Sequence, residues 1–327
     1  MQDWVETFED RINYYRNLIN EKLNQVVEKN KPSSFYEPVR YILKAGGKRI
    51  RPILVILACK SVGGKIEACL NSAVAIELLH NFTLVHDDIM DQDDLRRGML
   101  TVHKKWDEAT AILAGDGLVA LAYQYLLKTE SNKIREISEI FTNGIIELCE
   151  GQALDKEFEN EFKIDLAQYI SMIEKKTASL LMISLEIGAI IGGGNYSERK
   201  LLREFAKELG CAFQIQDDLL DIEETSGKTY GSDIQQRKKT FLFVHALNNA
   251  NQSDREQITA IYKQEEILSD DIVKVKNLLE SAGAIKFAQQ EVENRINKAQ
   301  GFLTKLQPSE SRDDLNMLLK WILNRKS

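Results

Sequence analysis

The sequence predicts an all-α protein built as one helical domain over residues 1–327. Leu, Ile, Ala, Glu and Lys dominate a chain with only four prolines, and residues 53–307 contain none, which favours long helices. Apolar residues recur at helical spacing, and no segment of useful length shows strand-like alternation. No linker rich in Pro, Gly or Ser divides the chain, so we expect a single antiparallel bundle.

The predicted helices follow one another along the whole chain. The first covers residues 1–30, and a break at KPSS separates it from a helix over residues 35–45. Pro52 favours the first turn of the third helix, which runs to Gly63-Gly64. The remaining predicted helices cover residues 66–92, 108–129, 133–159, 165–191, 198–224, 238–249, 255–264, 270–282, 285–304 and 310–325.

The charge balance argues against two classes of partner. With 43 basic and 50 acidic residues, the chain has a formal net charge of −7. A general nucleic-acid binder or a protein bound to anionic lipid needs a basic face to meet phosphates. We therefore expect no nucleic-acid partner and no general attraction to anionic membranes.

The cysteines and the apolar runs favour a cytoplasmic protein. The four cysteines show no C-x-x-C spacing and lie in apolar helical contexts, so we interpret them as reduced core thiols. The N-terminal segment is acidic and has no apolar signal region. No uninterrupted apolar run reaches the roughly 18 to 20 residues of a membrane span, so we expect no transmembrane segment.

Five aspartates lie within the stretch HDDIMDQDD, residues 86–94, and two arginines follow shortly after. Like charges three or four apart on a helix repel by roughly 0.2 to 0.5 kcal/mol per pair, so we expect an interaction that offsets the repulsion. Asp87 and Asp91 are four residues apart, which places both carboxylates on one helix face. His80 lies within about 20° of both around the helix axis.

A second stretch, FQIQDDLLDIEE at residues 213–224, repeats this spacing with Asp217, Asp218 and Asp221. Gln214 lies on the same polar stripe, and the flanking residues are apolar. A single acid run is commonly a solvated helix face, but two copies in otherwise apolar helices favour a binding site. An EF-hand is the poorer alternative, because its alternating acids, central Gly and closing Glu are missing.

Carboxylates in such an open arrangement suit Mg²⁺, which keeps several waters and completes its shell with substrate phosphates. Two clusters facing each other would hold several ions around one diphosphate, and these cations would offset the crowded acids. Two loops combine glycines with basic residues, AGGKRIRP at residues 45–52 and TSGKTYGSDIQQRKKT at residues 225–240. We expect these loops and the arginines to bind the anionic substrate.

Six motifs in order resemble the trans-isoprenyl diphosphate synthases, the head-to-tail prenyltransferases that make farnesyl, geranylgeranyl and longer polyprenyl diphosphates. They are GGKRIRP, HDDIMDQDDLRRG, EGQALD, EKKTASL, FQIQDDLLD and GKTYGSDIQQRKKT, within residues 44–240. The resemblance implies a homodimer of isoprenoid synthase type bundles, each around one deep central pocket with both acid stripes at its mouth. It also implies Mg²⁺ as the cofactor, about three ions per site, with Mn²⁺ as a substitute.

The resemblance assigns a role to each matching position. The implied metal ligands are Asp87, Asp88, Asp91, Asp217, Asp218 and Asp221. The residues that resemble the isopentenyl diphosphate site are Lys48, Arg51, His80 and Arg97. Those that resemble contacts to the allylic diphosphate are Arg96, Lys176, Lys228 and Lys238, with Lys239 as the alternative to Lys238. Thr177 and Gln214 resemble the neutral polar lining of the carbocation site, and Gln152 and Asp155 match the family's GQxxD.

Product length in this family depends on bulk below the first acid stripe. Phe82 lies five residues before Asp87, and no two-residue insertion separates Asp88 from Asp91. This pattern resembles the geranylgeranyl-type synthases, with a C20 product, and farnesyl or longer products are the alternatives. A helical wheel places Phe82 about 140° from Asp87, so its role as a plug depends on the resemblance.

Three rival functions remain to be distinguished. A class I terpene cyclase also ionises an allylic diphosphate with Mg²⁺, but it needs no second diphosphate site, which GGKRIRP and Arg97 would supply. A non-catalytic helical subunit of a heteromeric synthase would lack some of these acids or lysines. A helical scaffold would gain nothing from two buried acid stripes.

Overall fold

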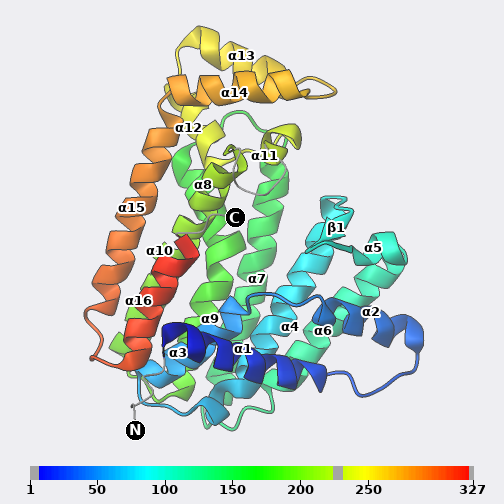
Figure 1. Ribbon diagram of the computed structural model, residues 1–327, viewed down its shortest axis with the longest axis vertical. Helices are drawn as coiled ribbons and strands as arrows, with labels where there is room; N and C mark the ends of the chain where they lie inside the picture. Colours follow the sequence, from blue (N-terminus) through cyan, green and yellow to red (C-terminus); the bar gives the residue numbers. More distant parts are fainter. Residues whose placement is uncertain (1–6, 224–230, 324–327) are drawn as a thin grey trace. The chain divides into compact units, whose positions relative to one another are not determined.

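The computed structural model describes residues 7–223 and 231–323, and within these ranges its regular elements are helices and one short hairpin, joined by turns and loops (Figure 1). Contacts group the chain into two compact units. The first comprises Met1–Thr142, Ile183–Lys200 and Gln307–Asp314, and the second comprises Asn143–Met182, Leu201–Leu306 and Leu315–Ser327. The all-α prediction is confirmed, and the single domain over residues 1–327 stays a prediction.

The elements have the following bounds. The first unit contains α1 (Phe8–Asn24), α2 (Ser33–Lys44), α3 (Ile50–Ser61), α4 (Ile66–Met90), β1 (Leu95–Arg96), β2 (Met99–Leu100), α5 (Val102–Lys105) and α6 (Glu108–Leu126). The second contains α8 (Leu166–Ile173), the π-helical turn η1 (Glu174–Ala178), α11 (Ser232–Gln235), α12 (Phe241–Asn249), α13 (Gln252–Tyr262), α14 (Ser269–Ser281) and α15 (Ala284–Leu303). The unit boundaries fall within α7 (Ile134–Phe158), α9 (Ser179–Ile191), α10 (Tyr196–Asp221) and α16 (Glu310–Leu323).

Helix α4 is central to the first unit, where it packs against α3 and α6. Every residue of α3 from Ile53 to Cys59 is fully buried. Gly188 of α9 permits close packing here, because a Cβ atom on it would lie 2.3 Å from the Val55 carbonyl oxygen. Truncating a core leucine in such packing costs about 2 to 5 kcal/mol, so this core gives α4 a firm support.

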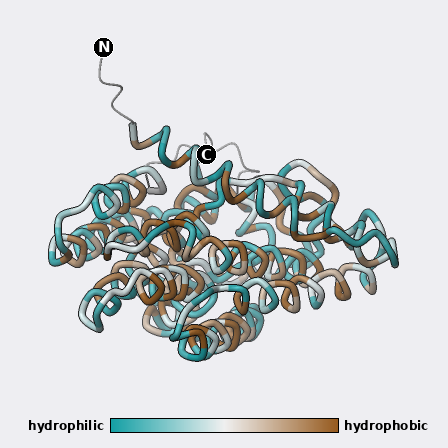
Figure 2. The backbone as a smooth tube through the Cα atoms, turned by 90° about the horizontal axis from the view of Figure 1, so that it is seen from below, coloured by the Kyte–Doolittle hydropathy of each residue, from teal (hydrophilic) through white to brown (hydrophobic). Residues whose placement is uncertain are grey.

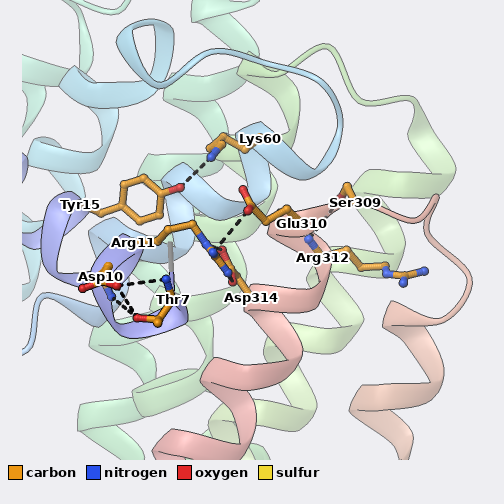
Figure 3. A network of polar contacts seen from close by, with 9 residues as sticks. All are labelled: Thr7, Asp10, Arg11, Tyr15, Lys60, Ser309, Glu310, Arg312 and Asp314. Atoms are coloured by element: carbon orange, nitrogen blue, oxygen red, sulfur yellow. Dashed lines mark hydrogen bonds and ion pairs between the residues drawn. The ribbon is translucent and has the colours of Figure 1, made fainter. Parts of the chain in front are cut away.

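An ion-pair network ties α1 to the first turn of α16 within the first unit (Figure 3). The Arg11 guanidinium donates to both carboxylate oxygens of Asp314, at 2.9 and 2.5 Å. Glu310 lies 3.3 Å from the same guanidinium, and Lys60 of α3 donates to the Tyr15 hydroxyl at 2.7 Å. The hydrogen bond to Asp314 raises the pKa of Arg11, so the guanidinium at the centre of this network stays charged.

The second unit has an aromatic core around α12. Phe241 stacks on Phe287 of α15 with ring centroids 5.8 Å apart, and Phe243 lies 4.3 Å from Tyr262 of α13. Helices α13 and α14 lie side by side (Figure 1). Figure 2 shows hydrophobic and hydrophilic positions recurring within the turns of individual helices. This recurrence at helical spacing is the periodicity that predicted the helices.

Most predicted helices are present with ends that differ by a few residues. The predicted helix 165–191 is interrupted by the π-helical turn η1, and residues 25–30 do not continue α1. The hairpin strands β1 and β2 are two residues each, too short for a periodicity to reveal.

Two helices in the described part of the chain, α4 and α6, are long and apolar enough to cross a membrane by length and composition alone. Neither helix forms an uninterrupted apolar run in the sequence, because one or two charged residues end a run but lower its mean hydropathy only slightly. The apolar window of α4 is 67% buried within the fold, as in core helices of soluble proteins. The expected absence of a membrane span therefore stays a prediction.

Candidate active site

The first acid stripe lies at the C-terminal end of α4. Asp87 and Asp91 are half-buried, whereas Asp88 is 4% exposed. Arg96 donates through Nε to Asp88 Oδ1 at 2.7 Å. Burial raises the pKa of Asp88 to about 6, although the Arg96 charge opposes this. Asp88 is thus bound to a protein cation.

The hairpin after this stripe directs Arg97 toward residues 45–49, the loop that leads into α3. Arg97 and Gly98 have positive φ angles of 54° and 75°, as the tightest hairpin turns require. The Arg97 guanidinium donates to the Gly46 carbonyl oxygen. A Cβ atom on Gly47 would lie 2.8 Å from that guanidinium, so the glycine leaves room for the arginine.

Three of the four residues that resemble the isopentenyl diphosphate site are grouped in the first unit. Arg51 Nη1 lies 3.2 Å from His80 Nε2, and since arginine only donates, this nitrogen accepts. Burial and the charges of Arg51 and Arg97 hold the pKa of His80 well below its usual value, so the imidazole is neutral. Lys48 is exposed on the loop that leads into α3.

The second unit contains a cavity of about 100 Å³. Its charged lining combines three lysines with four aspartates, a mixture that suits an anionic substrate accompanied by a cation. The polar residues around it are Asp155, Tyr169, Lys176, Thr177, Gln214, Asp217, Asp218, Asp233, Lys238, Lys239 and Thr240.

The π-helical turn η1 supplies two of these lining residues. π-Helical turns are rare and are frequent at functional sites. Gly151 of α7 allows this turn to come close, because a Cβ atom on it would lie 2.3 Å from the Lys176 backbone nitrogen. Lys176 forms an ion pair with Asp155, and Thr177 donates to Gln214 Oε1 at 2.9 Å.

Asp218 and Asp221 of the second acid stripe are 3% and 2% exposed and accept hydrogen bonds from the protein. Asp218 Oδ2 accepts from the Tyr169 hydroxyl at 2.6 Å and from the Phe241 N–H at 2.8 Å. Burial raises the pKa of Asp218 to about 7. Asp221 accepts from the Ser232 hydroxyl at 2.6 Å, which fixes the start of α11.

Lys238 and Lys239, the two candidates for one contact to the allylic diphosphate, differ in burial. Lys239 is 6% exposed, and its ammonium lies 4.3, 4.9 and 4.9 Å from the ring centroids of Phe162, Phe243 and Tyr262. Burial lowers the pKa of Lys239 to about 8. The Lys238 side chain is 42% exposed, so it has more freedom to follow a substrate.

The carboxylates suit a divalent cation. Among the described residues no three His, Cys, Asp or Glu side chains are close enough together to hold a metal ion. Mg²⁺ needs only one or two protein carboxylates, since waters and substrate phosphates complete its shell. The six predicted ligands are all carboxylates of this kind, and three of them, Asp88, Asp218 and Asp221, accept the hydrogen bonds from protein donors described above.

Two further predicted residues complete the comparison with the sequence. The Phe82 ring lies edge-on to His86 with centroids 4.7 Å apart. Lys228 lies outside the described residues. The sequence analysis did not identify Tyr169, because an aromatic residue on the apolar face of a helix gives no sign of a distant carboxylate partner.

The comparisons define the class of protein. The family model "Polyprenyl synthetase" matches residues 32–279, so the chain belongs to this family. It is an isoprenyl diphosphate synthase, a trans-prenyltransferase that acts on isoprenyl diphosphates.

Three relatives illustrate the match. The geranylgeranyl pyrophosphate synthetase of Pyrococcus horikoshii is 38% identical with a TM-score of 0.93, over 97% of this chain and 98% of that one. The geranylfarnesyl diphosphate synthase of Natronomonas pharaonis is 36% identical over 95% of each chain. A polyprenyl synthase of Caulobacter crescentus, solved with calcium and isoprenyl diphosphate, is 27% identical with a TM-score of 0.87, over 97% of this chain and 98% of that one.

Proposed function

We propose that this enzyme condenses isopentenyl diphosphate with an allylic diphosphate in a Mg²⁺-dependent reaction, with C20 geranylgeranyl diphosphate as its main product. The observation that carries the proposal is the grouping of Arg51, His80 and Arg97 in the first unit. An enzyme that ionises a single allylic diphosphate, such as a terpene cyclase, has no need of this additional cationic group.

The chemistry follows from the residue types. The allylic carbon–oxygen bond breaks, and its electron pair leaves with the diphosphate, whose growing charge Lys176, Lys238 and Arg96 stabilise. The isopentenyl double bond attacks the allylic cation, and the released diphosphate takes the final proton. Thr177 and Gln214, which bond to each other in the second unit, stabilise the cation through their dipoles without forming a bond to it.

Asp87, Asp91 and Asp217 would hold the divalent cations, with Asp88, Asp218 and Asp221 as nearby supports. The cation is Mg²⁺, about three ions per site, with Mn²⁺ as a substitute. When bound, it neutralises charge on the departing diphosphate. The calcium bound in the Caulobacter crescentus relative supports a divalent cation at this kind of site.

The C20 assignment depends on Phe82, whose bulk would stop the growing chain below the first acid stripe. The name of the Pyrococcus horikoshii relative supports this product. The name of the Natronomonas pharaonis relative supports a longer one. Farnesyl and longer polyprenyl diphosphates are therefore the alternatives.

The proposal includes a homodimer in the cytoplasm. Helix α6 exposes Ile112 and Leu113 by 47% and 57%, and Leu127 at its C-cap is 62% exposed, which is more apolar surface than a solvated helix needs. A second copy of the chain would cover this face. Burial of much of α4 supports a soluble protein.

The experiment that tests this function uses purified protein, Mg²⁺, labelled isopentenyl diphosphate and each of dimethylallyl, geranyl and farnesyl diphosphate. We expect condensation with a dominant C20 product after dephosphorylation. Cyclic hydrocarbons from the allylic diphosphate alone would indicate a cyclase. No product with any starter, or activity only after addition of another subunit, would contradict the proposal.

A further inference from the structure

The first unit contains a buried ion pair that no part of the reaction described above uses. Arg49 Nη1 lies 2.5 Å from Glu77 Oε1, and the two residues are 4% and 2% exposed. Buried charges are costly to desolvate and persist where their hydrogen bonds are satisfied. This pair meets that condition, since Asn81 Nδ2 also donates to Glu77 Oε1 at 3.3 Å.

The Arg49 guanidinium connects three helices. Its Nε donates to Asn20 Oδ1 of α1 at 3.0 Å, and its Nη2 donates to the Leu43 carbonyl oxygen near the end of α2 at 3.1 Å. The third connection is the bond to Glu77 of α4. Because the Arg49 side chain is buried and each of its nitrogens donates to a protein partner, it does not face a bound diphosphate, although it lies between Lys48 and Arg51 in the sequence.

The backbone of Arg49 is held in an unusual conformation. Its φ and ψ angles of 52° and 37° place it in the left-handed region at the N-cap of α3. A bulky residue with positive φ is uncommon and persists only where its surroundings fix it. The buried guanidinium is the feature that fixes it, because no side-chain hydrogen bond caps this helix end.

Both ends of the ion pair lie close in sequence to the proposed isopentenyl diphosphate site. Glu77 is one helical turn before His80, and Arg49 is two residues before Arg51, which lies 3.2 Å from His80. We infer that Arg49 and Glu77 are positioning residues that fix residues 45–49 and the first turn of α3 on α4, so that Lys48 and Arg51 converge with His80 on this diphosphate. The inference rests on the proposed function.

The test compares substitutions at buried ion pairs of the same unit. Glu77→Gln keeps the shape of the side chain but leaves the Arg49 charge without a counterion. We expect the KM for isopentenyl diphosphate to rise about tenfold or more, because a displaced Arg51 would lose a charge-assisted hydrogen bond to the diphosphate. The KM for the allylic diphosphate should change less than about twofold.

Asp314→Asn is the matched control, since it breaks the buried pair with Arg11 in a region without motif residues. It should lower the melting temperature and leave both KM values unchanged. Asn20→Ala removes only one bond of Arg49, so it should raise the same KM by a smaller factor, and it keeps the test decisive if Glu77→Gln does not fold.

The outcomes separate this inference from the proposed function. An active wild-type enzyme whose Glu77→Gln and Asn20→Ala variants lose only thermal stability, as the control does, would overturn the positioning role alone. An equal rise in both KM values would also overturn it. A wild-type protein that does not condense isopentenyl diphosphate would overturn the proposed function and the positioning role together.

Discussion

Phe82 is the side chain on which the proposed product length depends. Its ring lies edge-on to His86 one turn further along α4, and such pairs four residues apart stabilise each other on a helix surface. We predict that Phe82→Ala yields longer products, because removal of the ring frees space for further isoprene units. Chain lengths after dephosphorylation measure the effect, and Phe82→Tyr is the bulky control that should keep the wild-type product. An unchanged distribution for Phe82→Ala would exclude the plug.

The burial of Lys239 has a consequence for stability. Its pKa of about 8 in the folded protein lies below the value of 10.5 for an exposed lysine, so the folded state loses this proton before the unfolded state does. Below pH 8 both states hold the proton, and the buried charge costs about 3 kcal/mol. Between about pH 8 and 10.5 the folded state has lost this proton while the unfolded state keeps it, so the cost of burying the charge disappears. The free energy of unfolding therefore rises with pH over this range, compared with a variant that lacks the lysine.

We therefore predict that Lys239→Met stabilises the protein at pH 7 and that the gain shrinks toward pH 10. Urea unfolding at several pH values measures the difference between this variant and wild type. Lys263→Met is the control, because Lys263 is exposed and its ammonium lies over the Phe162 ring at 5.4 Å. A difference that stays constant with pH would contradict the assigned titration.

At the scale of elements, the π-helical turn η1 and α7 depend on each other. Gly151 allows the backbone of η1 to come close to α7, and this contact places Lys176 and Thr177 at the cavity of the second unit. The sequence predicted both residues from the EKKTASL motif. It did not predict the π-helical turn, because residues 179–191 that follow are almost entirely apolar, so a shift in the phase of the helix leaves no visible change in the apolar pattern.

We predict that Gly151→Ala displaces η1, because the new Cβ atom would meet backbone atoms that cannot move independently. The expected cost is about 1 to 3 kcal/mol of stability, together with at least a tenfold loss of turnover from the misplaced lysine. Gly301→Ala in α15 is the matched control, since its Cβ would have no atom within 4 Å. Full turnover in Gly151→Ala would show that the close approach is not required.

At the scale of the whole molecule, the sequence predicted the features that depend on residue spacing within a single helix. Helix positions and the two acid stripes follow from spacing along a single element, and the structure has helices where they were expected. The hydrogen-bond partners of the buried acids could not be predicted from the sequence, because they lie far away along the chain. Tyr169 lies 49 residues from Asp218, and Arg49 lies 28 residues from Glu77. Glu77 did carry a signal, since it is the charged residue in the otherwise apolar run AVAIELL.

The whole-molecule account requires both acid stripes for one reaction. Asp87→Ala and Asp217→Ala each remove a carboxylate from a different stripe, while Asp94→Ala removes an exposed acid that pairs with Lys104. The most direct measurement is the turnover of these three variants with isopentenyl and farnesyl diphosphate at saturating Mg²⁺, with melting temperatures as a check on folding. The account predicts losses of about 10³-fold or more for Asp87→Ala and Asp217→Ala and near wild-type turnover for Asp94→Ala. Retained turnover in both folded stripe variants would contradict it.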